Sequence, residues 1–134
     1  MHGAGKALRS AIALAIMAGA LAGCATEPGR RIQAIFSPQP GEAALASGLK
    51  QYENGDYADS AKSLGTAVDQ GLRDADRVKA HKHLAFIHCA SSRERQCRDE
   101  FRKALAVDPS MELTPAEAGH PVWGPVFRSL KSGR

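Results

Sequence analysis

Histidine and cysteine are the residues best able to do chemistry in this chain, which has five histidines and three cysteines. His81 and His88 share one face of an expected helix, but seven residues separate them, roughly 10 Å along a helix axis. One metal ion cannot bridge that span, and no His, Glu or Cys pair at helical spacing completes a tetrahedral set. No nucleophile has an evident base, and no glycine-rich phosphate loop is present. We therefore expect no catalytic residue, no metal site and no cofactor.

Cys24, the first cysteine in the chain, follows a stretch that is organised like a targeting signal. Lys6 and Arg9 form a short basic region, with no acidic residue before Glu27. An apolar run over residues 11–21 has the length of a signal-peptide core. It is too short for a transmembrane helix, which needs about 20 apolar residues.

The residues Leu21-Ala22-Gly23-Cys24 resemble the lipobox of bacterial lipoproteins. The resemblance implies a diacylglycerol on the Cys24 sulfur, cleavage before Cys24 and acylation of the new amino group. Two or more acyl chains give a stable membrane anchor, whereas one chain holds a protein only reversibly. Ala25 follows, where aspartate often retains lipoproteins at the inner membrane, so the resemblance favours the outer membrane, facing the periplasm. The alternative is an ordinary signal peptide with a chance cysteine.

Charge and composition exclude one class of partner and divide the chain into three parts. Removing Lys6 and Arg9 with a signal peptide of residues 1–23 leaves 16 basic against 14 acidic residues, about +2. Without a basic stripe interleaved with aromatic residues, we expect no nucleic-acid binding. Residues 24–41 would form a lipidated, proline-rich tether, and residues 42–134 a helical domain.

Helical periodicity begins at Glu42, and no alternating strand pattern follows. We predict an all-α domain with a first helix that ends near Asn54-Gly55, a turn dipeptide. Three more helices are expected at about 57–70, 74–90 and 96–107. Gly71 suits a helix C-cap, and Asp108-Pro109 ends the last of these helices.

Two successive helix pairs resemble units of the tetratricopeptide repeat. Gly48, the Gly55-Asp56-Tyr57 turn and Leu64 match the first unit, and Leu84-Ala85 with Phe101 match the second. Gly48 and Ala85 are small enough to allow close helix approach. The sequence departs from the repeat at His81 and His88, where Trp and Tyr are usual, and at Ser60 and Cys97, where alanine is usual. Two repeats expose apolar ends, so the C-terminal segment must supply a cap.

That C-terminal segment contains a predicted capping box at Thr114 and Glu117, with Pro115 at the first helical position. Gly119 is expected to end this turn. The only tryptophan, Trp123, follows in an apolar cluster. Either Trp123 plugs the end of the helical stack, or it is an exposed anchor for a partner, because tryptophan is enriched at binding hot spots.

Cys89 and Cys97 flank the turn between the third and fourth helices. In an oxidising compartment we expect them to form a disulfide, worth about 2–3 kcal/mol by chain entropy. The alternative is two free buried thiols. We interpret Glu94, Asp99 and Glu100 as solvated side chains on the turn and an exposed helix face.

The chain as a whole resembles the TssQ-like lipoproteins associated with the bacterial type VI secretion system. The resemblance rests on the order of lipobox, tether and helical hairpins, and on residues 101–127. The matching residues are Phe101, Ala104, Asp108-Pro109, Leu113, Ala116-Glu117, Gly119-His120-Pro121 and Trp123-Gly124-Pro125.

The resemblance implies a non-catalytic adaptor at the outer membrane that binds a periplasmic protein, such as a subunit of the secretion membrane complex. Its concave face would supply the contacts, together with Trp123 if that residue is exposed. The expected partner-binding residues are Leu45, Leu49, Tyr52, Lys82, Phe86 and Trp123. One alternative is a pilotin- or assembly-type lipoprotein of another envelope system, and another is a small hydrolase or metal-handling protein.

Overall fold

The computed structural model describes residues 37–133, and within that range the chain is all-α. Six helices occur there, and no strand does. They are α2 (Glu42–Glu53), α3 (Tyr57–Gln70), α4 (Asp74–Ala90), α5 (Glu94–Val107), α6 (Pro115–Ala118) and α7 (Trp123–Ser132). The predicted fold class is therefore confirmed. The expected signal peptide, Cys24 and most of the expected tether lie outside the described residues.

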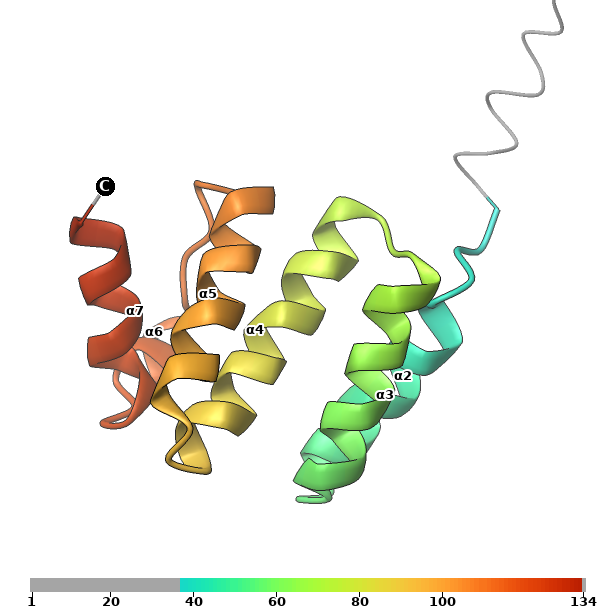
Figure 1. Cartoon of the computed structure of the whole chain (residues 1–134), viewed down its shortest axis with the longest axis horizontal. Coiled ribbons are helices and arrows are strands. Elements are labelled where there is room, and N and C mark those ends of the chain that lie inside the picture. The colour runs from blue at the N-terminus through green and yellow to red at the C-terminus, as the bar shows by residue number, and fades with distance from the viewer. Residues whose placement is uncertain (1–36, 134) are drawn as a thin grey trace, which may run out of the picture. The chain divides into compact units, whose positions relative to one another are not determined.

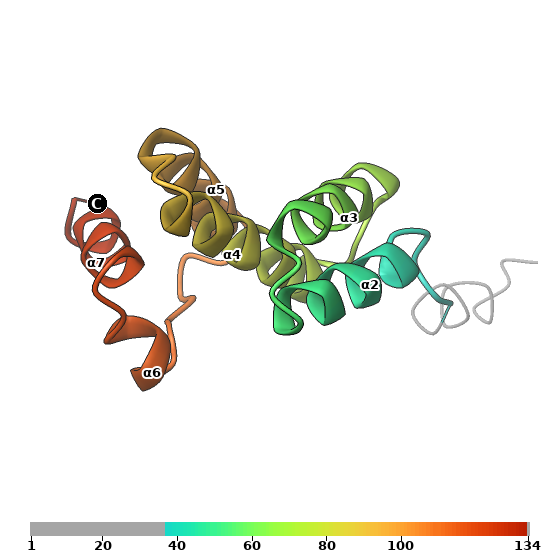
Figure 2. The same ribbon diagram turned by 90° about the horizontal axis from the view of Figure 1, so that it is seen from below.

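The helices form two hairpins, α2/α3 and α4/α5, followed by the C-terminal pair α6 and α7 (Figure 1). Helix α7 packs against α5 and α4. Seen from below, α3 and α5 lie on one side of the stack and α2 and α6 on the other, with α4 between them (Figure 2). The C-terminal segment thus returns to the side of α4 on which α2 lies.

Local signals account for most of the helix ends. Gly55 and Gly71 have φ angles of +85° and +101°, a region that glycine adopts without a Cβ clash. Helix α5 ends before Asp108-Pro109 as expected, but it begins at Glu94 rather than near residue 96. Its first turn carries the acidic Glu94, which suits the positive end of the helix dipole.

The first hairpin is held by small residues. A Cβ at Gly48 would lie 2.7 Å from Leu64 Cγ, so only glycine lets α2 approach α3 this closely. Ser60, where the repeat pattern has alanine, is buried and donates from Oγ to the Gly48 carbonyl at 2.7 Å. The N-terminal core of the domain is Leu45, Leu64, Ala67, Leu72, Ala80, Leu84 and Ile87.

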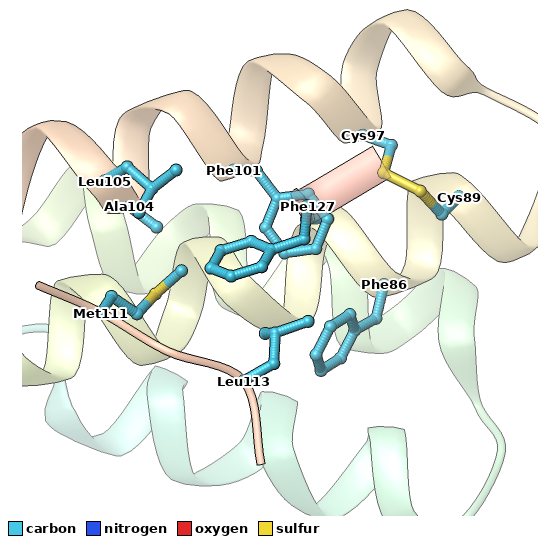
Figure 3. Packing of buried hydrophobic residues seen from close by; sticks show 10 residues of the cluster. Phe86, Cys89, Cys97, Phe101, Ala104, Leu105, Met111, Leu113 and Phe127 are labelled. Carbon is cyan, nitrogen blue, oxygen red and sulfur yellow. A yellow bond between two sulfur atoms is a disulfide. The ribbon is translucent and has the colours of Figure 1, made fainter. Parts of the chain in front are cut away.

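Larger side chains fill the second half of the domain. The C-terminal core is Ala85, Phe86, Cys89, Cys97, Phe101, Ala104, Leu105, Met111, Leu113 and Phe127. Figure 3 shows its rings gathered between α4, α5 and α7, with Met111 and Leu113 contributed by the loop that follows α5. The C-terminal segment therefore covers the end of the second hairpin with apolar side chains, as a cap would.

A disulfide joins Cys89 and Cys97 at the end of the α4/α5 hairpin, with Cα atoms 5.0 Å apart. That separation lies within the normal range for a disulfide. The turn it closes contains Ser92 at φ +59°, the non-glycine residue with positive φ among residues 37–133. The bond thus spans a turn that lacks the glycine of the first hairpin.

The capping box at Thr114 forms as predicted. The Glu117 N–H donates to Thr114 Oγ1 at 3.3 Å, and the Thr114 N–H donates to Glu117 Oε2 at 2.9 Å. Pro115 occupies the first helical position. These contacts fix the start of α6, which positions Glu117 for the contacts described below.

The expectation that Glu100 is solvated is wrong. Glu100 is buried between the hairpin helices, and His81 Nδ1 lies 2.6 Å from its Oε2, while Lys103 Nζ donates to its Oε1 at 2.6 Å. Burial alone would raise the pKa of Glu100, but the hydrogen bonds from His81 and Lys103 outweigh it and hold this pKa below its ordinary value. His81 thus stands at its unusual position because Glu100 faces it.

Candidate interaction face

A continuous line of rings runs from the α2/α3 turn across α4 to the start of α7. We call it the aromatic strip, and its members in spatial order are Tyr57, Tyr52, His83, Phe86, Trp123 and His120. Successive ring centroids are 5.4, 5.0, 5.8, 4.5 and 3.3 Å apart. Because neighbouring rings contact one another, the strip links both hairpins to the C-terminal segment.

A tight turn, helical spacing and the return of the C-terminal segment place the rings of the strip. Tyr52 is in the last turn of α2 and Tyr57 begins α3, so the tight turn at Gly55 brings the two rings together. His83 and Phe86 are three residues apart on α4, which puts them on one face. Trp123 begins α7, close to the point where the chain has returned to α4.

Two of the predicted partner-binding residues are corrected by their burial. Leu45 is 5% exposed and belongs to the N-terminal core. Phe86 is 2% exposed, because Trp123 covers one side of its ring and Phe101 packs edge-on at 5.9 Å. Both side chains support the face from within and offer almost no surface to a partner.

Lys82 is engaged by the chain itself. Its Nζ lies 2.7 Å from Glu117 Oε1, and both side chains are about four-fifths buried. Burial raises the pKa of Glu117, but the hydrogen bonds from Lys82 and the Thr114 N–H hold it below its ordinary value. Glu117 on α6 therefore engages the ammonium group of Lys82 that the sequence assigned to a partner.

Trp123 combines the two roles that the sequence left open. Its ring stacks on Phe86 and His120, and its Nε1–H donates to the Glu117 carbonyl at 2.9 Å. It packs against the C-terminal core but stays partly exposed. Leu49 and Tyr52, also half-buried, pack against the N-terminal core. The accessible part of the face is thus the partly exposed edge of the strip.

His83, Tyr57 and His120 belong to this face but were not predicted from the sequence. The spacing of His83 and Phe86 was a usable signal, whereas the positions of Tyr57 and His120 depend on a turn and on the return of the C-terminal segment. Burial lowers the pKa of His83, although its hydrogen bond with the Lys79 carbonyl at 2.8 Å acts in the opposite direction. Burial likewise raises the pKa of Tyr52. His83 and Tyr52 are therefore uncharged at neutral pH.

Uncharged rings with a few hydrogen-bonding atoms at their edges suit the binding of an apolar or aromatic segment of another protein. Within residues 37–133, no three His, Cys, Asp or Glu side chains are grouped so that they could hold a metal ion. Among the same residues, none of the helices combines the length and the hydropathy of a membrane-spanning segment.

Comparison of the chain with protein-family models, with curated proteins and with solved structures finds no match.

Proposed function

We propose that this protein is a lipid-anchored, non-catalytic adaptor whose aromatic strip binds a periplasmic segment of another envelope protein. The supporting observation is the strip itself, which crosses both hairpins and ends in Tyr57, a ring that is 48% exposed. The other rings of the strip except Phe86 are partly exposed, and a contiguous row of such rings suits a contact surface. In this proposal the hairpins are repeats of the tetratricopeptide type.

The proposed anchor and location rest on the lipobox resemblance, and the proposed secretion role rests on the resemblance to TssQ-like lipoproteins. Cys24 would carry the lipid, and the protein would face the periplasm from the outer membrane as an accessory of the type VI secretion system. Substituting Cys24→Ser should release the protein from the membrane fraction or leave it unprocessed. Unchanged fractionation and processing would contradict lipidation.

The binding function is tested by crosslinking and pull-down of the lipidated protein from envelopes. Tyr57→Ala removes the exposed ring at the end of the strip, and its own contact is with Tyr52. We expect this variant to lose most of the captured partner. Thr66→Ala, an exposed substitution elsewhere on α3, is the matched control and should capture as much as the unaltered protein.

The captured proteins discriminate between the two adaptor roles. Subunits of the secretion membrane complex would support the proposal. Pilus or outer-membrane assembly subunits would favour a pilotin- or assembly-type lipoprotein of another system. Equal capture by Tyr57→Ala and Thr66→Ala would show that the strip is not the contact surface.

A further inference from the structure

Residues 114–123 form a stretch of the C-terminal segment that contacts α4 without entering the core, and we call it the strap. Leu113 before it and Gly124 after it are buried, whereas none of the residues between them is fully buried. Among the helices of residues 37–133, the backbone of α6 closely approaches that of α7 alone (Figure 2). The strap is therefore held on α4 by side chains rather than by packing of helix on helix.

One turn of α4 receives the strap. Glu117 of the strap pairs with Lys82 across 2.7 Å. The ring of Trp123 stacks on Phe86, with centroids 4.5 Å apart. Lys82 Nζ lies 5.8 Å from the centre of the Phe86 ring, so the charge and the ring form one continuous surface. The sequence assigned both residues of α4 to a partner protein, and the strap of the same chain contacts them instead.

The strap presents its carboxylate and its indole ring as a fixed pair. Trp123 Nε1–H donates to the Glu117 carbonyl at 2.9 Å. The Thr114 N–H donates to Glu117 Oε2 at 2.9 Å, while Oε1 of the same carboxylate faces α4. The ligand that this turn of α4 holds is thus one carboxylate and one aromatic ring, carried on a short segment.

The strap can leave α4 while the fold stays intact. The C-terminal core retains Met111 and Leu113 before the strap and Phe127 after it, so both ends remain anchored. Release of the strap alone would leave the Lys82 ammonium unpaired and Phe86 uncovered, so the free protein should stay closed. A second segment with a carboxylate and a ring would pair with the same ammonium and cover the same ring. Exchange would then leave no partly buried charge unpaired.

We propose that the strap is an internal substitute for the partner, and that a partner segment with an acidic and an aromatic residue displaces it from Lys82 and Phe86. This inference rests on the proposed adaptor function and deepens it, because it adds the chemistry of the partner and a closed state of the binding face. Tyr57, which is 48% exposed, stays available in the closed state and would make the first contact.

The first test measures strap opening in the purified full chain, where Trp123 is the only tryptophan. Lys82→Met and Glu117→Gln each break the pair, and glutamine also suits the capping box. Loss of this charged hydrogen bond should shift the ratio of closed to open strap about tenfold and raise acrylamide quenching of Trp123. The helical circular dichroism should persist. Glu112→Gln is the matched control, because it breaks a pair with Lys131 outside the strap and should leave quenching unchanged.

The second test supplies the strap as a separate molecule. A fluorescein-labelled peptide with the sequence of residues 113–123 should bind Glu117→Gln about tenfold more tightly than it binds the unaltered chain, because the internal competitor is weakened. It should bind Lys82→Met weakly, although the strap is open there, because the ammonium group is missing. A peptide with glutamine in place of its glutamate should bind Glu117→Gln about tenfold more weakly. Fluorescence anisotropy measures each affinity.

Capture of the partner from envelopes connects the strap to the adaptor function. Glu117→Gln should capture more partner than Glu112→Gln. Equal or smaller capture by Glu117→Gln, with capture still lost in Tyr57→Ala, would overturn the strap proposal and leave the adaptor proposal standing. Full capture by Tyr57→Ala would instead overturn the adaptor proposal.

Three further outcomes contradict the strap proposal without any partner. Unchanged quenching of Trp123 in both Lys82→Met and Glu117→Gln would show that the strap is a fixed part of the fold. Absence of peptide binding to Glu117→Gln would show that α4 does not recognise this chemistry. Concentration-dependent dimers of Glu117→Gln in sedimentation would assign the surface to an exchange of straps between two copies of this chain.

Discussion

The two hairpins of this domain reach the same arrangement by different means. The α2/α3 hairpin uses a glycine in its turn, a glycine at its closest helix contact and the buried Ser60 hydroxyl. The α4/α5 hairpin has a serine in the corresponding left-handed turn, a disulfide beside it and a core of phenylalanine rings packed edge to face. The first hairpin therefore relies on small residues that let its helices approach closely. The second relies on a disulfide and on large apolar side chains.

This difference predicts that the second hairpin depends more on large side chains. Phe101 is fully buried, and its ring contacts Phe86 and Phe127. Phe101→Ala should lower the free energy of unfolding by about 3–5 kcal/mol, because it leaves a cavity between α4, α5 and α7. Leu64→Ala in the first hairpin is the matched variant and removes fewer atoms. Urea denaturation followed by circular dichroism measures both, and a smaller loss for Phe101→Ala than for Leu64→Ala would contradict the comparison.

Removing the disulfide should destabilise the second hairpin more than the first. The double substitution Cys89→Ser with Cys97→Ser should cost about 2–3 kcal/mol, since it frees a short loop in the unfolded chain. The measurement is amide hydrogen exchange. Protection should fall at the facing ends of α4 and α5 and persist in α2 and α3. Equal loss of protection in both hairpins would show that the bond stabilises the domain as a whole.

The sequence predicted the parts of this fold that depend on local chemistry. Gly71, Asp108-Pro109 and the capping box at Thr114 act within one or two helical turns, so their effects on helix ends can be deduced from neighbouring residues. The ring contacts from Tyr52 to Trp123 and the ion pair between Lys82 and Glu117 join residues far apart in the chain. They depend on how α2 and the C-terminal segment pack against α4, which no local pattern encodes.

Burial of charged groups was unpredictable for the same reason. Glu100 lies on α5 between the half-exposed Asp99 and the buried Phe101, and the approach of His81 from α4 explains why its carboxylate lies inside. Leu45 and Phe86 were likewise expected on the open concave face of a stack of hairpins. The pattern does not reveal that the C-terminal segment covers Phe86.

The buried carboxylate of Glu100, in the second hairpin, predicts that the stability of the domain depends on pH. The pKa of Glu100 is lower in the folded state than in the unfolded chain. Its ionised carboxylate therefore contributes fully to the stability of the fold above the ordinary pKa of glutamate, and this contribution is lost as the pH falls through the lowered pKa. Hydrogen bonds to a charged group suggest a loss of about 1.5 kcal/mol. The groups facing Glu100 are His81, Lys103 and, more distantly, His88.

Thermal unfolding between pH 7 and pH 3 measures this contribution. Glu100→Gln should flatten the acid limb of the stability curve. It should not abolish that limb, because the pKa values of Glu117 and Asp108 are also lowered. Parallel curves for the variant and the unaltered protein would show that the buried pair does not contribute to acid sensitivity.

The smallest expected effect concerns the turns themselves. Ser92 has φ +59° and Gly55 has φ +85°, so the two turns place different residue types in the same unfavourable region. A left-handed conformation costs a non-glycine residue about 1–2 kcal/mol, and the greater flexibility of unfolded glycine offsets about 0.5–1 kcal/mol of that. Ser92→Gly should therefore stabilise the domain by about 0.5–1 kcal/mol, and Gly55→Ser should destabilise it by a similar amount.

Urea denaturation of both variants, each with and without the disulfide, tests whether the bond holds the strained turn. If it does, Ser92→Gly should recover part of the stability lost in the double cysteine variant, whereas an equal gain in both backgrounds would mean that turn and bond act independently.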